Sequence, residues 1–126
     1  MLSQSKLIGF VATTSPDKAK NFYGEVLGLA LKEDGPYALV FAASETSIRV
    51  QKVENVNVCG YTVLGWEVED IALAVNGLVR RGVRFERYPW LEQDDAGIWR
   101  TSDGSAVAWF KDPDGNTLSL TEFKAR

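Results

Sequence analysis

A duplicated helix signature constrains the fold of this chain more than any other feature. In the first copy, Ser15 can cap a helix with its hydroxyl, Pro16 suits the first helical position and Gly28 suits a left-handed C-cap. In the second copy, Asp70 and Gly82 occupy the equivalent cap positions, 55 and 54 residues further along the chain. We therefore interpret the sequence as one supersecondary unit written twice with a one-residue gap.

Apolar residues recur at helical spacing after each N-cap, as expected for a helix with one buried face. The first set is Ala19, Phe22, Tyr23 and Val26, and the second is Ile71, Ala74, Val75 and Leu78. Each set predicts a helix of about three turns.

Short runs of β-branched and apolar residues surround both helices and predict strands. They cover residues 7–14, 37–43 and 47–53 in the first half, and 62–68, 83–88, 97–101, 105–111 and 117–123 in the second. EDGP and DPDGN carry turn chemistry, so Asp112 and Asp114, like Asp103, are expected to bond their own turns.

Together these elements predict an α+β fold of two tandem βαβββ modules. Module 1 spans about residues 5–53, a connector spans 54–61 and module 2 spans about 62–123. A chain of 126 residues that is 45% hydrophobic can bury one sizeable core, so we expect a single domain over residues 1–126. The repetition implies two similar sheets that face one shared cavity or interface.

The charge distribution argues against nucleic acid and anionic membranes as partners. The formal net charge is -3 and the basic residues are scattered, which favours small molecules or proteins. No apolar run approaches a membrane span or a signal-peptide core, and the single cysteine, Cys59, agrees with a reducing compartment. We expect a cytoplasmic protein, with Cys59 an ordinary loop thiol.

The sequence contains no histidine. Histidine is the commonest general base and the commonest neutral metal ligand in proteins. Ser-His and Cys-His nucleophiles and histidine-containing metal sites are therefore excluded within one chain.

Three segments resemble the glyoxalase, bleomycin-resistance and extradiol-dioxygenase superfamily, also called vicinal oxygen chelate proteins. They are FVATTSPDKAKNFYGEVLGL, GWEVEDIALAVNGLVRRGV and WFKDPDGNTLSL, and the match spans nearly the whole chain. The resemblance implies paired βαβββ modules whose curved mixed sheets enclose a ligand site, often completed by dimerisation. We therefore expect a homodimer.

The resemblance also implies where a divalent metal would bind. Superfamily enzymes place a histidine or glutamine seven residues before each helix cap and a glutamate three residues after the asparagine of DPDGN. Those places here are Ile8, Val63 and Ser119, and the duplicated pattern gives Arg49 as the fourth. Isoleucine and valine cannot bind a metal, serine is a weak ligand and arginine repels a cation. We expect no metal and no cofactor, which argues against glyoxalase isomerisation, ring-cleaving dioxygenation and metal-dependent fosfomycin opening.

Because side chains alternate along a strand, residues two apart from these positions share the cavity side. Trp90 follows a proline beside an acidic run and should cover a pocket or a partner. The predicted ligand-binding residues are Ile8, Phe10, Arg49, Gln51, Val63, Glu67, Trp90, Ser119 and Thr121. The intervening residues should pack under the helices, namely Leu64, Trp66, Val68, Leu118 and Leu120.

These observations predict a metal-independent binding protein that sequesters a drug or metabolite. Its ligand would be a small organic molecule with an anionic group held by Arg49 or with an aromatic group. The alternative is a lyase, isomerase or dioxygenase-related enzyme that uses a relocated metal, or Glu67 as base with Arg49 stabilising an oxyanion. A simpler interpretation has Arg49 and Glu67 pairing or reaching solvent, and a third hypothesis has the fold serving as an interaction module.

Overall fold

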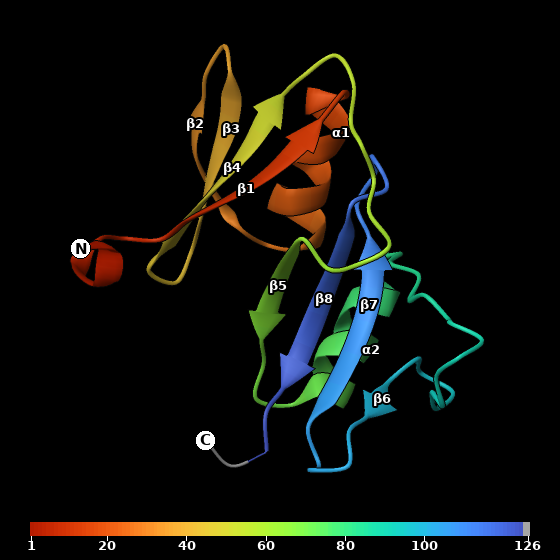
Figure 1. The fold of residues 1–126 in the computed structure, drawn as a ribbon. Coiled ribbons are helices and arrows are strands. Elements are labelled where there is room, and N and C mark those ends of the chain that lie inside the picture. The colour runs from red at the N-terminus through yellow and green to blue at the C-terminus, as the bar shows by residue number, and fades with distance from the viewer. Residues whose placement is uncertain (125–126) are drawn as a thin grey trace.

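The computed structural model describes residues 1–124, which form two four-stranded mixed sheets, each with a helix packed on it (Figure 1). A short 3-10 helix, η1 (Leu2–Gln4), precedes the first module. Module 1 contains β1 (Ile8–Thr13), α1 (Pro16–Lys20), the π-helical continuation η2 (Asn21–Val26), β2 (Ala30–Asp34), β3 (Ala38–Ala43) and β4 (Thr46–Lys52). Module 2 contains β5 (Leu64–Glu67), α2 (Ile71–Arg80), β6 (Trp99–Arg100), β7 (Ala106–Lys111) and β8 (Thr117–Glu122). The predicted α+β fold of two βαβββ units is confirmed.

The two sheets repeat one topology. Sheet A has the strand order β1-β4-β3-β2, and sheet B has the order β5-β8-β7-β6. In each sheet the first and last strands of the module pair in parallel, and the other pairs are antiparallel. The duplication that was inferred from the helix caps therefore extends to the strand order.

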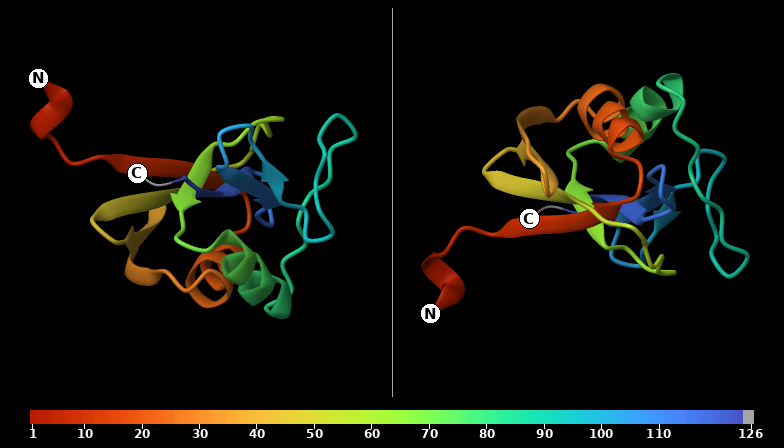
Figure 2. Two further views of the ribbon diagram at one scale, coloured as in Figure 1. Left: turned by 90° about the horizontal axis from the view of Figure 1, so that it is seen from below. Right: turned by 90° about the horizontal axis from the view of Figure 1, so that it is seen from above.

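Both helices lie on the same side of the sheets, so the opposite face of each sheet is open (Figure 2). One hydrophobic core joins the two modules under the helices. Its fully buried members include Tyr23, Phe41, Val75, Phe110 and Leu118. The sheets meet where β1 passes β5, and a Cβ atom on Gly9 would lie 3.1 Å from Cδ1 of Leu64.

The register of the strands agrees with the predicted alternation. Leu118 and Leu120 are buried, and Leu64 and Trp66 pack against the core. Ile8, Phe10 and Val63 face the open side and are 48%, 50% and 39% exposed.

The cap predictions are confirmed at three of four positions. Asp70 accepts a hydrogen bond from the backbone N–H of Leu73 at 3.1 Å, and Gly28 and Gly82 have positive φ angles of 78° and 95°. Ser15 does not cap, because its side chain bonds no helix N–H, so that prediction was wrong.

Two strand predictions also differ from the structure. β2 extends to Asp34, into the predicted EDGP turn, where Asp34 pairs with Lys52 at 2.8 Å and Lys20 at 3.4 Å. Residues 83–88 form no strand beyond an isolated bridge between Phe85 and Phe110. The physical reason is that the side chain of Gln93 takes the place of the hydrogen bonds that a neighbouring strand would make. It accepts from the Tyr88 N–H at 2.8 Å and donates to the backbone carbonyls of Glu86 and Gly97.

The DPDGN turn of module 2 forms hydrogen bonds with residues of module 1. Asp112 is buried and accepts hydrogen bonds from the hydroxyl of Tyr23 at 2.6 Å and from Nδ2 of Asn116 at 2.8 Å. The same Nδ2 donates to the carbonyl of Ala12 at 2.9 Å. Burial, reinforced by the charge and hydrogen bond of Asp112, raises the pKa of Tyr23 far above its usual range, so its hydroxyl stays a donor. Asp112 does bond its own turn, as predicted, and in addition joins the modules.

Asp114 makes the second link between the modules. It accepts hydrogen bonds from the hydroxyl of Thr13 and from the backbone N–H and hydroxyl of Thr14, the latter two at 2.8 Å. Burial of the carboxylate opposes its ionisation, but these hydrogen bonds outweigh that effect and lower the pKa of Asp114.

No helix within residues 1–124 is long and apolar enough to cross a membrane.

Candidate ligand-binding face

A row of three residues crosses the centre of the open face of sheet B. Gly65 on β5 pairs with Ser119 on β8, which pairs in turn with Trp109 on β7. A Cβ atom on Gly65 would lie only 2.8 Å from Oγ of Ser119, so a larger residue would crowd the serine. Gly65 itself is exposed, so the sheet presents bare backbone at this position.

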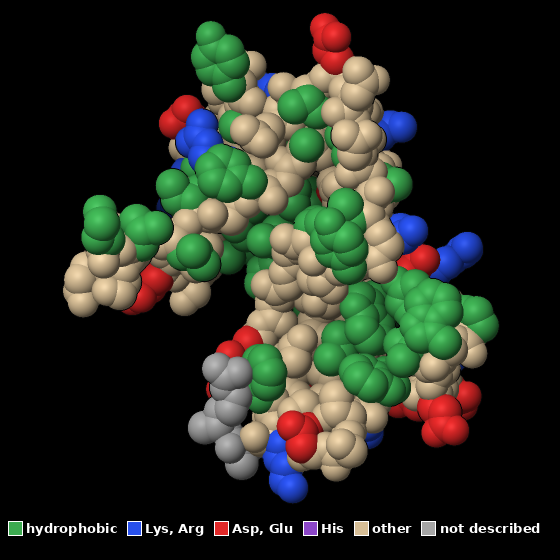
Figure 3. Space-filling view, in the orientation of Figure 1, with side chains coloured by type: hydrophobic (Ala, Val, Ile, Leu, Met, Phe, Trp, Pro, Cys, Tyr) green, Lys and Arg blue, Asp and Glu red, His purple; other side chains and the backbone are tan. Residues whose placement is uncertain are grey.

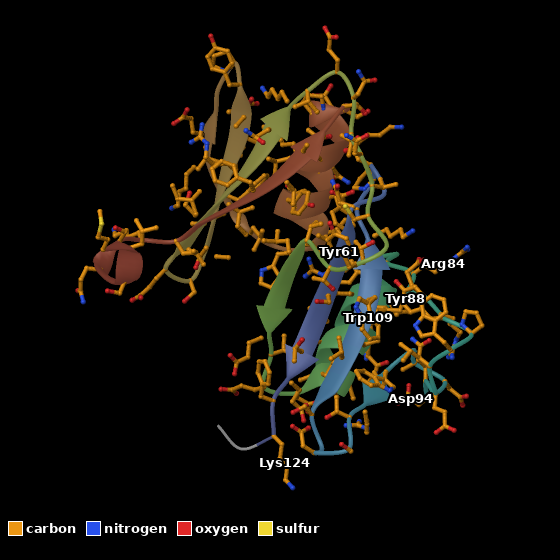
Figure 4. The ribbon with its side chains drawn as sticks, viewed as in Figure 1. Tyr61, Arg84, Tyr88, Asp94, Trp109 and Lys124 are labelled. Carbon is orange, nitrogen blue, oxygen red and sulfur yellow. The ribbon has the colours of Figure 1, made fainter. Side chains whose placement is uncertain are left out.

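Four aromatic side chains form a continuous cluster that begins at Trp109 of this row. Trp109 contacts Tyr88 edge to face at a centroid distance of 5.5 Å and Trp99 at 6.1 Å, and Tyr88 stacks on Trp90 at 5.0 Å. Tyr88 and Trp109 lie side by side between β7 and the loop of residues 83–98 (Figure 4). We call Tyr88, Trp90, Trp99 and Trp109 the aromatic cluster.

The aromatic cluster is accessible from outside. Trp90 is 73% exposed, and the other three members are half-buried. Hydrophobic side chains gather over this part of sheet B in the space-filling view (Figure 3). Contiguous exposed apolar patches mark interaction surfaces and ligand-binding grooves.

The loop that carries Tyr88 and Trp90 is fixed by hydrogen bonds rather than by strand pairing. Besides the contacts of Gln93, Oδ1 of Asp94 accepts from the backbone N–H groups of Ala96 and Ile98, each at 2.9 Å. Burial, with a smaller contribution from Glu86, raises the pKa of Tyr88, so its hydroxyl is a neutral hydrogen-bond donor at neutral pH. The loop therefore presents a rigid aromatic pair with one polar atom.

A hollow of about 440 Å³ lies beside the aromatic cluster. Its lining residues are Trp90, Glu92, Asp94, Ile98, Trp99 and Arg100. Charged side chains of both signs therefore border the indoles of Trp90 and Trp99.

Sheet A has an equivalent row with different side chains. Phe10 on β1 pairs with Arg49 on β4, which pairs with Val40 on β3. Phe10 therefore occupies the place of Gly65, Arg49 that of Ser119 and Val40 that of Trp109. The open face of sheet A carries no comparable aromatic cluster within residues 1–124.

The predicted ligand-binding residues separate into two groups and one loop residue. The open face of sheet A carries Ile8, Phe10, Arg49 and Gln51. Sheet B carries Glu67, Ser119 and Thr121, with Val63 immediately before β5, and Trp90 lies on the loop of residues 83–98. Glu67 and Thr121 are direct partners across β5 and β8.

The two candidate catalytic residues lie in different sheets, Arg49 in sheet A and Glu67 in sheet B. Within residues 1–124 the ion pairs are those of Asp34 with Lys20 and with Lys52. Arg49 and Glu67 therefore form no ion pair with each other in this part of the chain. The structure therefore offers no support for the interpretation in which the two charges simply neutralise one another.

The residues at the superfamily's metal positions do not fit a divalent cation. Ile8 and Val63 supply hydrocarbon, Arg49 supplies a positive charge and Ser119 supplies one hydroxyl, 6% exposed. Within residues 1–124, no three His, Cys, Asp or Glu side chains gather into a group that could hold a metal ion. We therefore derive no reaction step through a metal at this locus.

Sequence reasoning predicted Trp90 as a ligand residue but did not predict the ring contacts that join Tyr88, Trp99 and Trp109 to it. The signal was present in β7, whose sequence AVAWFK alternates buried Ala106, Ala108 and Phe110 with the outward-facing Trp109. The contact of Trp109 with Tyr88 could not be inferred, because residues 83–88 were expected to form a strand.

Comparisons with known proteins agree with this architecture. A model of the glyoxalase/bleomycin resistance protein/dioxygenase superfamily matches residues 8–120, whereas no curated protein matches the chain. A superfamily member from Sphaerobacter thermophilus DSM 20745 is similar in structure, with a TM-score of 0.75, 22% identity, and coverage of 98% of this chain and 100% of that chain.

Two further solved structures share the fold and have different described activities. TnmS3, an antibiotic binding protein from Streptomyces sp. CB03234, has a TM-score of 0.71 and 24% identity, covering 98% of this chain and 99% of its own. Lactoylglutathione lyase from Agrobacterium tumefaciens has a TM-score of 0.72 and 14% identity, covering 94% and 93%. With the family model matched over most of its length, the chain belongs to the glyoxalase/bleomycin resistance protein/dioxygenase superfamily.

Proposed function

We propose that this protein binds a small, flat organic molecule on the open face of sheet B without a metal ion, and that it sequesters a drug or a metabolite. The observation that carries the proposal is the accessible aromatic cluster on sheet B. A flat ligand would lie against Trp109 and be bounded by Trp90 and Tyr88.

The chemistry of the face supports this class of ligand. Stacking or edge-to-face contact between aromatic rings stabilises by roughly 0.5–1.5 kcal/mol per pair beyond the burial of area. The hydroxyl of Thr121 and the carboxylate of Glu67, which are direct partners across β8 and β5, are available for polar contacts. A mostly apolar surface with a few placed polar groups is typical of small-molecule sites.

The side chains at the former metal positions support metal independence. Arg49 and Ser119 occupy equivalent positions in the two sheets, and neither could replace a carboxylate on a divalent cation. The fold serves both an antibiotic binding protein and a lactoylglutathione lyase. The loss of all four ligand positions favours binding over metal-assisted catalysis here.

We further propose that the protein acts in the cytoplasm as a homodimer. Phe10 and Ile8 are about half-exposed on sheet A, and the segment before β1 extends away from the body with Leu2 and Leu7 81% and 78% exposed (Figure 1). A second copy would cover this apolar surface. Light scattering should give twice the monomer mass at tens of micromolar, and a monomer would contradict the proposal.

Tryptophan fluorescence of EDTA-treated protein tests the binding proposal. We expect anthraquinone-2-sulfonate or 9-aminoacridine to quench the fluorescence saturably, with an affinity that added Zn²⁺, Mn²⁺ or Ni²⁺ does not change. The variant Trp90→Ala should weaken binding, whereas Leu73→Ala on the exposed face of α2 should not. Binding that requires added metal, or that is the same in Trp90→Ala, would contradict the proposal.

A further inference from the structure

We propose a second binding site on the helix side of the molecule, which takes a small organic anion with an apolar body, such as a medium-chain carboxylate. The site is a groove of about 390 Å³ where the end of η2 approaches α2. It lies under the helices, on the opposite side of sheet B from the aromatic cluster. We call it the inter-module groove.

The inter-module groove is apolar and reaches the core. Its floor includes Phe110 and Leu120, which are 0% and 4% exposed, together with the half-buried Trp66. Its walls include Leu27 from module 1 and Leu78 from α2. A hydrocarbon chain or ring in this groove would be removed from water on both sides, which stabilises by about 25 cal/mol for each Å² buried.

A glycine keeps one wall of the groove open. Gly77 lies within α2, where glycine destabilises a helix by roughly 0.5–1 kcal/mol relative to alanine. A Cβ atom at this position would meet no atom within 4 Å. The wall therefore has room for a ligand atom where most helices carry a side chain.

Arg81 provides the charge at the mouth of the groove. Its Nη1 donates to the backbone carbonyl of Glu25 at 2.9 Å, which anchors the guanidinium across the two modules. Nε and Nη2 bond no group among residues 1–124, so they are available to an anion. Guanidinium groups bind carboxylates with paired hydrogen bonds.

The other charged residue of the lining does not oppose an anion. Glu67 contributes to the groove from β5, but the alternation along that strand turns Trp66 toward the helices and Glu67 toward the open face. Arg81 is therefore the charged side chain that the described lining presents to a ligand. The volume suits a small molecule and excludes a helix or a folded partner segment.

Nuclear magnetic resonance of the four indole N–H groups tests this proposal, because Trp66 alone lines the groove and the other three tryptophans belong to the aromatic cluster. We expect octanoate to shift the Trp66 signal saturably and to leave the other three unchanged. The signal is assigned with Trp66→Phe. Octanol, which lacks the anion, should bind at least tenfold more weakly.

Matched variants separate the site from a folding defect. Gly77→Leu should fill the groove and abolish octanoate binding, while Gly77→Ala should raise the melting temperature and show that the helix tolerates a side chain there. Arg81→Gln should weaken binding about tenfold. Arg80→Gln, one residue away and outside the lining of the groove, should leave octanoate binding unchanged.

Several results would overturn the proposal. They are an unshifted Trp66 signal at millimolar octanoate, wild-type binding by both Gly77→Leu and Arg81→Gln, or shifts confined to the aromatic cluster. A Trp66 signal that responds to protein dilution instead of octanoate would show that a second copy occupies the groove.

Discussion

The central rows of the two open faces have the same strand positions and different side chains. Sheet A carries Phe10, Arg49 and Val40, where sheet B carries Gly65, Ser119 and Trp109. In sheet A the ring lies on the first strand of the module, and in sheet B it lies on the third, where Tyr88 and Trp99 contact it. The duplicated framework therefore fixes where side chains point, while the residues decide which face can receive a ligand.

The turns between the last two strands of each module differ in the same way. In module 2 the DPDGN turn bonds Tyr23, Thr13 and Thr14 of module 1. In module 1 the corresponding turn at residues 43–46 is exposed and carries Ser44 at a φ of 53°. One turn joins the modules, and the other only reverses the chain.

The largest expected effect concerns these turns. Asp112→Ala should lower the free energy of unfolding by about 3 kcal/mol, because it removes the buried acceptor of the Tyr23 hydroxyl, of the Asn116 backbone N–H and of one Nδ2 hydrogen bond of Asn116. Glu45→Ala in the other turn should change it by less than about 0.5 kcal/mol. Urea denaturation measures both, and equal effects would show that the turns do not differ.

The second-largest expected effect concerns ligand affinity at the open faces of the two sheets. Trp109→Ala should weaken binding of a flat aromatic probe about 30-fold, as expected when a central aromatic contact of roughly 2 kcal/mol is removed. Val40→Ala, the equivalent change in sheet A, should alter the affinity less than about twofold. Fluorescence titration of the two variants with the probe measures both affinities. Similar losses in the two variants would place the ligand across both sheets rather than on sheet B.

Gly65→Ala tests how closely β5 and β8 pack beside the binding face. The added Cβ would lie 2.8 Å from Oγ and 3.2 Å from the carbonyl oxygen of Ser119, so the serine side chain or the strands must shift. We expect a loss of about 1–2 kcal/mol in stability and weaker probe binding. Thermal denaturation and titration measure the two effects. A fully stable variant with unchanged affinity would show that the glycine is not needed for either.

The smallest effect is a dependence on pH. Because the pKa of Asp114 is lowered in the folded state, its contribution to stability is complete above the unfolded value of about 4 and is lost as the pH falls through the lowered pKa. Asp114→Asn should therefore be less stable than wild type at pH 7, and the difference should shrink below about pH 4. A difference that is constant between pH 7 and pH 3 would argue against this role.

The parts of the fold that depend on local chemistry could be predicted from the sequence. Asp70, Gly28 and Gly82 end or begin helices through their own backbone and side chains, and the strand alternation placed Phe10 and Glu67 on the open face. Ser15 does not cap, and its backbone N–H bonds the hydroxyl of Thr13, which in turn donates to the distant Asp114.

The aromatic cluster and the inter-module links could not be predicted, because they depend on contacts between distant residues. Gln93 holds the loop through backbone groups that a strand would have paired, which brings Tyr88 onto Trp109. The hydrogen bond from Tyr23 to Asp112 joins residues 89 positions apart. Neither contact has a signature in composition or spacing.

The most direct test of metal-independent binding on sheet B is an indole N–H titration of EDTA-treated protein with anthraquinone-2-sulfonate. We predict saturable shifts of Trp90, Trp99 and Trp109, no comparable shift of Trp66, and no change on adding a divalent metal. Shifts that appear only with metal, or that leave Trp109 unmoved, would contradict it.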